Sequence, residues 1–148
     1  MSGYTVVRDY PYPIEEVWHV LTDPHCVSRW TSSGRSGRPE GYAPVPGTDF
    51  RFVGRPVMGW AGIVYCHVVE VDEPTSLHYT WRSDEDADDA THVTYLLGPV
   101  PGGTRFTWDH TGFTGAAGFA MSRLLGSVRR KMLTEGVPLV LADRHRSL

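Results

Sequence analysis

Residues 115–132 read GAAGFAMSRLLGSVRRKM, and this stretch decides the fold. Five of its apolar residues recur at the spacing of one helical face: Met121, Leu124, Leu125, Val128 and Met132. Its basic residues fall mostly on the opposite face: Arg123, Arg129, Arg130 and Lys131. We therefore predict a long amphipathic helix from Gly115 to about Arg144, which Gly136 and Pro138 kink or end before a last turn or two. Such a helix must bury its apolar face against the rest of the protein.

The chain before this helix is predicted to form antiparallel strands. Strand-forming residues, alternation and turn signals define six segments: residues 4–10, 48–53, 58–71, 77–82, 92–97 and 104–111. In the longest of them, Gly59 and Gly62 are candidate bulges. Two short helices follow the first strand, one opened by Pro13 and the other by Asp23 as N-cap before Pro24. Residues 31–46 are rich in Gly, Ser and Pro and are predicted to form a long surface loop.

These elements predict a single α+β domain over residues 1–148. We expect a curved antiparallel sheet of six or seven strands wrapped round the C-terminal helix, with the two short helices at one end. Alternation places one set of side chains on the inner face of the sheet: Phe50, Phe52, Leu77, Tyr79, Trp81, Val93, Tyr95, Leu97, Phe106, Trp108 and His110. The long helix begins with glycines and alanines, which leave volume unfilled, so we expect a cavity between helix and sheet.

Composition narrows the class of protein. Five Trp, seven Tyr and five Phe are a generous supply of aromatic residues for 148 residues. A net charge of −3 argues against a nucleic-acid partner, because binding to the phosphate backbone requires a basic surface. The sequence shows neither a membrane-length apolar run nor a signal-peptide pattern, so we expect a cytoplasmic protein without a membrane partner. Cys26 and Cys66 have no metal-site spacing and are expected to be free buried thiols.

Motifs of known catalytic chemistry are not legible in the sequence. It contains no serine elbow, no HExxH, no phosphate-binding glycine loop and no dinucleotide fingerprint, and no metal or cofactor is expected. Glu15 and Glu16 are adjacent and point in different directions, so they do not form a carboxylate pair. The acidic residues 83–90 lack the spacing of a calcium loop and are predicted to form a solvated hairpin tip. The basic run at 129–131 is interpreted as a solvated helix face rather than a phosphate site.

Several stretches, in the same order along the chain, resemble the START-like (SRPBCC) superfamily. PIEEVW at 13–18, LTDP at 21–24 and Trp30 are similar to its opening. VEVDEP at 69–74, LHYTW at 77–81 and GTRFTWDHTGF at 103–113 resemble the branch named after activators of the heat-shock-protein-90 ATPase. The resemblance implies a helix-grip fold, in which a sheet of six or seven strands surrounds the C-terminal helix and usually encloses a hydrophobic ligand cavity.

The chain also departs from the pattern of that branch. Thr31 follows Trp30 where two Trp are common, and Thr48 follows Gly47 where a second Gly is common. Ser127 follows Gly126 where many members carry Trp, and this loss predicts an enlarged or reshaped cavity. The cochaperones that named the branch carry a separate N-terminal domain, which this chain is not expected to contain.

His110 is the most interesting polar residue of the predicted inner face. It could act as a general base or bind a ligand oxygen, or it could be a core histidine held by a neighbouring hydroxyl or water. The inward aromatic residues could likewise line a site for a planar ligand or form a plain core. The candidate ligand-binding residues are Trp30, Phe50, Phe52, Trp60, Tyr79, Trp81, Tyr95, Phe106, Trp108, His110, Phe119, Leu125 and Val128.

Three functions are compatible with these residues. The first is binding of a hydrophobic, aromatic or polyketide-like small molecule for sequestration, transport or resistance. The second is a polyketide cyclase or aromatase, in which the cavity folds a reactive chain and His110 or a tyrosine moves a proton. The third is a cochaperone that binds a protein partner through an exposed patch. Few inward residues are polar, which favours binding over catalysis, and a homodimer is compatible with the sequence.

Overall fold

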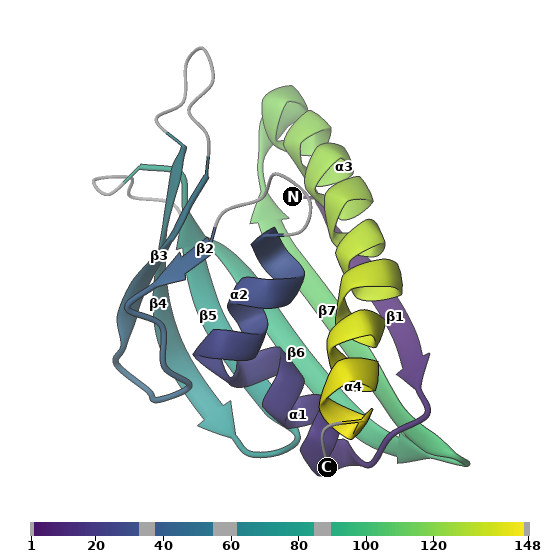
Figure 1. Ribbon diagram of the computed structural model, residues 1–148. Helices are drawn as coiled ribbons and strands as arrows, with labels where there is room; N and C mark the ends of the chain where they lie inside the picture. Colours follow the sequence, from purple (N-terminus) through teal and green to yellow (C-terminus); the bar gives the residue numbers. More distant parts are fainter. Residues whose placement is uncertain (1, 33–37, 55–61, 85–89, 147–148) are drawn as a thin grey trace.

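The computed structural model describes residues 2–32, 38–54, 62–84 and 90–146 (Figure 1). One antiparallel sheet has the strand order β1-β7-β6-β5-β4-β3-β2. Its strands are β1 (Ser2–Tyr10), β2 (Arg38–Glu40), β3 (Asp49–Val53), β4 (Ile63–Asp72), β5 (Ser76–Arg82), β6 (Thr91–Val100) and β7 (Gly103–Phe113). The helices are α1 (Ile14–Thr22), α2 (Pro24–Ser32), α3 (Gly115–Lys131), the π-helical turn η1 (Met132–Gly136) and α4 (Val137–Arg146).

The predicted α+β class, the curved antiparallel sheet and the helix-grip arrangement are confirmed. Asp23 caps α2 as expected, because its Oδ2 accepts the backbone N–H groups of His25 and Cys26 at 3.1 and 3.2 Å. The predicted 31–46 loop contains the three-residue strand β2, which is too short to leave a periodic signal. In β4 the register shifts between Val68 and Glu70 rather than at a glycine, and Gly59 lies outside the described residues.

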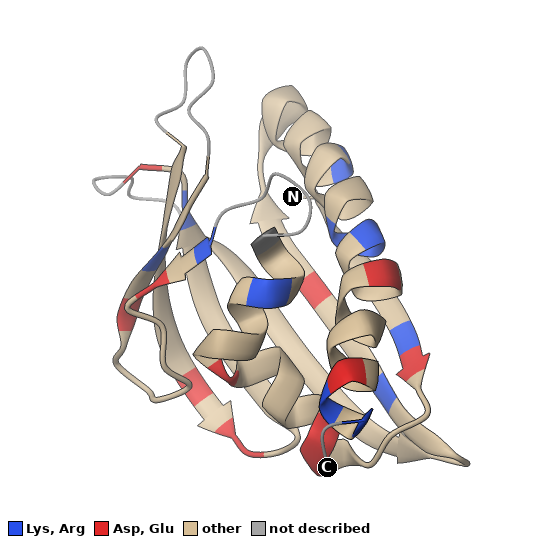
Figure 2. Cartoon of the chain, in the orientation of Figure 1, with Lys and Arg blue, Asp and Glu red and all other residues tan. Residues whose placement is uncertain are grey.

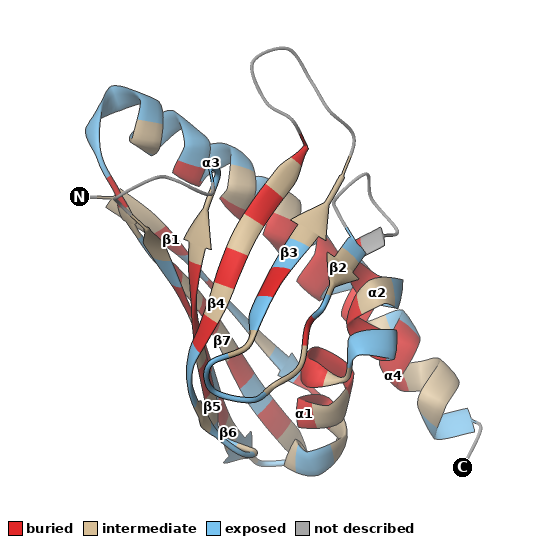
Figure 3. Cartoon of the chain, turned by 90° about the vertical axis from the view of Figure 1, so that its left-hand side faces the viewer, coloured by how far each residue is buried: buried red, intermediate tan, exposed pale blue. Residues whose placement is uncertain are grey.

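The helices lie on one face of the sheet. Helix α3 packs against β1 and β7, while α1 and α2 lie at the end of the sheet where η1 and α4 also pack (Figure 1). Buried and exposed residues alternate along the strands, as the sequence pattern requires (Figure 3). In the part of the chain that the structure describes, no helix is long and apolar enough to cross a membrane.

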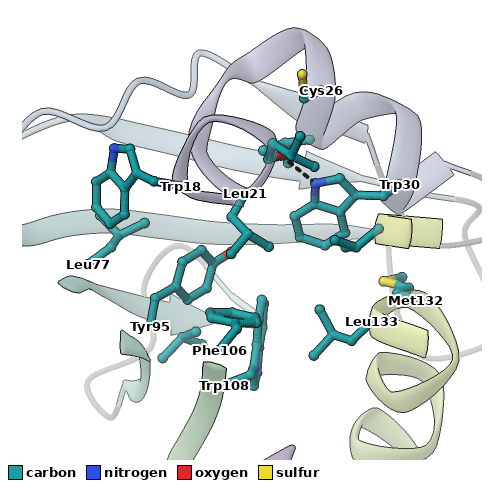
Figure 4. Close-up of a cluster of buried hydrophobic side chains, with 14 of the residues drawn as sticks. Trp18, Leu21, Cys26, Trp30, Leu77, Tyr95, Phe106, Trp108, Met132 and Leu133 are labelled. Atoms are coloured by element: carbon teal, nitrogen blue, oxygen red, sulfur yellow. Dashed lines mark hydrogen bonds between the residues drawn. The ribbon is translucent and has the colours of Figure 1, made fainter. Parts of the chain in front are cut away.

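The core is most completely filled where α1, α2, η1 and α4 meet the sheet (Figure 4). Its largest fully buried side chains include Leu21, Trp30, Leu77, Phe106, Trp108 and Leu133. Each such side chain contributes roughly 1.5–3 kcal/mol to folding relative to an exposed position. This end of the molecule therefore provides much of the stability.

The buried face of α3 differs from the predicted one. Met121 and Leu124 are 48% and 59% exposed, whereas the buried residues of α3 are Ser122, Gly126 and Arg129. The observed face is thus rotated by one residue, about 100° of helix. The reason is close packing on β1: a Cβ added to Gly126 would lie 3.2 Å from Cγ of Tyr4. A side chain here would require Tyr4 or the helix to shift, and glycine avoids that shift.

The predicted break at Gly136 and Pro138 is replaced by a π-helical turn, and the helix continues into α4. In this turn the N–H of Val137 bonds to the carbonyl of Met132, five residues back. The same spacing would pair the Leu133 carbonyl with the nitrogen of Pro138, which carries no hydrogen. The phenol of Tyr10 donates to this carbonyl instead, at 2.7 Å. A side chain of β1 thus replaces the backbone donor that proline lacks.

We expect the Tyr10→Phe variant to lower the free energy of unfolding by about 1–3 kcal/mol, because it leaves the buried Leu133 carbonyl without a donor. Urea denaturation followed by circular dichroism measures the change. Adding Pro138→Ala restores a backbone N–H at the position five residues after Leu133. The double variant should therefore lose less stability than the sum of the two single variants, and strict additivity would contradict this account.

Candidate functional site

The inner face of the sheet carries a continuous wall of aromatic side chains. Phe50 lies 5.5 Å from Phe52 and 5.3 Å from Tyr79, measured between ring centroids. Phe52 continues to Trp81 at 6.0 Å, and Tyr79 continues to Tyr95 at 6.0 Å. The wall exists because alternate residues of β3, β5 and β6 share one face, as the sequence predicts.

The wall continues onto β7 through Phe106, Trp108 and His110, which are completely buried. Tyr95 contacts the first two at 5.1 and 4.9 Å, and Trp81 contacts His110 at 5.2 Å. The structure therefore brings together eight of the thirteen candidate ligand-binding residues: Phe50, Phe52, Tyr79, Trp81, Tyr95, Phe106, Trp108 and His110.

One end of the wall is not fully buried. Phe52 and Trp81 are partly exposed, although both belong to the inward-facing set. On the helix side, Leu125 and Val128 of α3 are partly buried against the same core. Among the described candidates, these four apolar side chains are the ones that are neither buried nor fully exposed.

The remaining candidates lie elsewhere. Trp30 is buried among the helices, where its indole N–H donates to the Val20 carbonyl at 2.9 Å, so it belongs to the core in Figure 4. Phe119 is 51% exposed on α3, with the Arg123 guanidinium 5.0 Å from its ring. Trp60 lies outside the described residues.

Hydrogen bonds fix His110 on both sides of its ring. Nε2 lies 2.7 Å from Oγ1 of Thr91, and Nδ1 lies 3.1 Å from the Tyr4 hydroxyl oxygen. The Thr91 hydroxyl donates its one proton to the Trp81 carbonyl at 3.3 Å, so it accepts from Nε2–H. Nδ1 is then the acceptor for the Tyr4 hydroxyl, whose oxygen accepts the indole N–H of Trp108 at 3.2 Å.

This network assigns His110 to the second interpretation of the sequence, a core histidine held by neighbouring hydroxyls. Its pKa is lowered to about 3, chiefly by burial and additionally by the positive charge of Arg129 and by the nearby His92. The neutral ring has no free lone pair, because the Tyr4 hydroxyl occupies Nδ1. A general base needs such a lone pair within reach of the substrate.

Arg129 is the site residue that the sequence did not reveal. It was interpreted as part of a solvated basic face, but it is only 5% exposed. Its guanidinium carbon lies 4.1 Å from the centre of the Trp108 ring, and Nη1 donates to the sulfur of Met132 at 3.1 Å. Its position three residues after Gly126, on the face of small residues, was the available signal.

Buried tyrosines and a thiol surround this arginine. Burial raises the pKa of the Tyr79 and Tyr95 phenols and of the Cys66 thiol, and the positive charge of Arg129 opposes the rise in each case. The Tyr79 hydroxyl has no partner at hydrogen-bond distance, and neither has Nε of Arg129, although Tyr79 is close enough to Tyr95 to act on the pKa of that phenol as a donor. The interior thus combines an apolar wall with two unused hydrogen-bond donors.

Two further features lie away from the wall. An open cleft of about 790 Å³ lies beside the start of β1 and is lined partly by Arg123 and Arg130, but by none of the candidate ligand residues. His19, Asp23 and Cys26 place their ligand atoms within 4.8 Å of one another and are the one potential metal-binding group among the described residues. Asp23 caps α2, and burial raises the pKa of the Cys26 thiol. A metal ion would therefore have to displace the capping hydrogen bonds of Asp23 and the proton of Cys26.

The pKa of His110 predicts how stability depends on pH. Below about pH 6.5 the unfolded chain takes up a proton on this ring that the folded protein excludes until about pH 3. The free energy of unfolding should therefore decrease as the pH is lowered across this window, by up to about 1.4 kcal/mol per pH unit. In the His110→Gln variant, urea titrations between pH 4 and 6 should show a shallower slope. The exposed His25→Gln should keep the wild-type slope, and parallel curves for wild type and His110→Gln would refute the assignment.

Comparison with known proteins places this geometry in a family. Among solved structures, protein MLL2253 from Mesorhizobium loti is 25% identical with a TM-score of 0.68, covering 95% of this chain and 98% of that one. CalU16 from Micromonospora echinospora is 17% identical with a TM-score of 0.65, covering 97% and 83%. PFC0360w, an HSP90 activator from Plasmodium falciparum, is 17% identical with a TM-score of 0.60, covering 76% and 74%.

The last two similarities show the fold alone. A search of curated proteins gives no match. The family model described as "Activator of Hsp90 ATPase homolog 1-like protein" matches residues 11–132, which include α1, α2, six strands and all of α3. The chain therefore belongs to this family, within the START-like superfamily that its sequence resembles.

Proposed function

We propose that this protein binds an apolar, largely aromatic small molecule between the concave face of the sheet and α3. The partial exposure of Phe52 and Trp81 carries the proposal, because large inward-facing aromatic side chains are otherwise fully buried in this fold. Leu125 and Val128 supply apolar surface from the helix side. Burial of ligand surface against such residues contributes roughly 25 cal/mol per Å² of apolar area.

Aromatic residues also suit a planar ligand specifically. Phe50, Phe52 and Tyr79 meet edge to face, and Trp81 lies tilted against Phe52. An added ring can extend such an arrangement at similar distances. Sequestration or transport of an aromatic or polyketide-like compound follows from this chemistry, with the cytoplasmic location and the homodimer standing as predictions.

Catalysis by His110 receives less support. Its nitrogens are engaged by Thr91 and Tyr4, so proton transfer would first require a break in the network. A cyclase would have to use Tyr79 or Arg129, which hold unused donors but no free base. These groups orient and stabilise a ligand oxygen rather than remove a proton.

Binding of a protein partner is the second candidate, and one observation favours it. Phe119, Met121 and Leu124 are about half exposed on α3 and add apolar surface to the outside of the helix. Met121 and Leu124 lie about 60° apart round the helix, so a protein partner would gain from covering both, whereas Phe119 lies on another side. The two functions use different residues, so variants separate them.

We expect planar aromatic compounds such as flavonoids and anthraquinones to quench the tryptophan fluorescence saturably and to raise the melting temperature. The Phe52→Ala variant should weaken binding roughly tenfold, because it removes a contact worth about 1.5 kcal/mol. Phe119→Ala removes the same side chain from the exposed helix face and should bind like wild type. Failure of every compound to bind, or equal loss in both variants, would contradict a site at this wall.

A further inference from the structure

Arg129 is a charged residue inside the core of this protein. Its guanidinium is buried against Trp108 and Met132, neither of which carries a negative charge. Within the described ranges, every ion pair joins other residues, and Arg129 forms none. A buried cation without a carboxylate partner is costly in a folded protein.

The groups around Arg129 do not supply the missing charge. Its field reaches Tyr4 on β1, Cys66 on β4, Tyr79 on β5, Tyr95 on β6 and His110 on β7. Burial keeps the phenols and the thiol protonated, and His110 is neutral, so none is an anion at neutral pH. Arg130 is exposed and adds a second positive charge near Tyr4. Figure 2 shows basic residues along the same helix.

Unused hydrogen-bond donors lie in the same region. Nε of Arg129 is buried and has no acceptor, while the ring face of Trp108, the sulfur of Met132 and the Tyr4 hydroxyl engage other parts of the guanidinium. The Tyr79 hydroxyl is also buried without an acceptor. Buried donors of this kind are normally satisfied in folded proteins. An oxygen acceptor brought in by a ligand would satisfy a donor of this kind.

We propose that Arg129 and Tyr79 form a subsite for an anionic oxygen, so that the ligand is an aromatic acid carrying a carboxylate or an ionised phenol or enol. The subsite presupposes the ligand-binding function proposed above and specifies its substrate class. Tyr79 contacts Phe50 and Tyr95, and Trp108 contacts Tyr95, so the subsite lies at the inner end of the aromatic wall. The apolar body of the ligand would extend from there toward Phe52 and Trp81.

A purely structural role for Arg129 makes a different prediction. If the contact with Trp108 offsets the cost of burying the charge, replacing the arginine should destabilise the fold and leave the ligand preference unchanged. If the charge serves a ligand, a neutral side chain of similar length should be tolerated or even stabilise the empty protein. Stability and selectivity together separate the two roles.

The test compares 2-naphthoic acid, which is ionised at pH 7, with its methyl ester. Both present the same rings, and only the acid carries the anionic oxygen. Fluorescence titration of the wild-type protein should show that the acid binds roughly tenfold to a hundredfold more tightly. High salt should weaken this preference little, because the charge is buried.

The variants assign the preference to one side chain. Arg129→Met should remove the preference for the acid, keep binding of the ester and leave the melting temperature unchanged or raised. Arg130→Met is the matched control, because it removes the adjacent exposed arginine, and it should keep the preference. Tyr79→Phe should reduce the preference without abolishing it.

The outcomes distinguish this subsite from the general function. Equal affinity of acid and ester for the wild-type protein overturns the anion subsite and leaves the aromatic site standing. A preference that survives in Arg129→Met also overturns it. If neither compound nor any other planar aromatic binds, the proposed function fails, and the subsite fails with it.

Discussion

The close approach of α3 to β1 determines the rest of this structure. Gly126 lies directly against Tyr4, and a Cβ added to Gly118 would lie 3.1 Å from the backbone of Phe113. These two glycines, eight residues apart, let the helix backbone rest on the edge of the sheet. The rotation that follows turns Arg129 inward over Trp108 and turns Met121 outward. A side chain at position 126 would require Tyr4 or the helix to shift by a few tenths of an ångström.

Two polar arrangements share the interior, and they differ in completeness. The network of His110 is closed, since each donor from Trp108 to Thr91 has an acceptor. Such a network fixes the strands that it joins and offers nothing to a ligand. Arg129 and Tyr79 are open, since each keeps a buried donor without a partner. The polar groups of the interior are therefore fully hydrogen-bonded around His110, whereas Arg129 and Tyr79 keep the donors on which the proposed subsite is based.

The sequence predicted the sheet better than the helix. Period-two alternation correctly placed Tyr79, Tyr95 and Trp108 on the inner face. These strands bury one face, and large apolar side chains at alternate positions identify which face it is. On a helix, the search for periodicity considers only the positions of large apolar residues. It therefore could not identify Gly126 as the residue where the helix contacts the strand. Arg129 stood in a basic run and was assigned to solvent for the same reason. Neither the π-helical turn nor a three-residue strand leaves a periodic signal.

The continuous C-terminal helix divides its length between two tasks. In α3 the buried residues are a serine, a glycine and an arginine, none of which is apolar and large. Beyond Arg129 the buried residues become large and apolar: Met132, Leu133, Val137, Val140 and Leu141. The π-helical turn lies at this boundary, where Tyr10 anchors it through the Leu133 carbonyl. Because the well-packed half holds the helix in place, the other half can keep a buried charge and unused donors without loss of the fold. That division is consistent with the ligand site that we propose between α3 and the sheet.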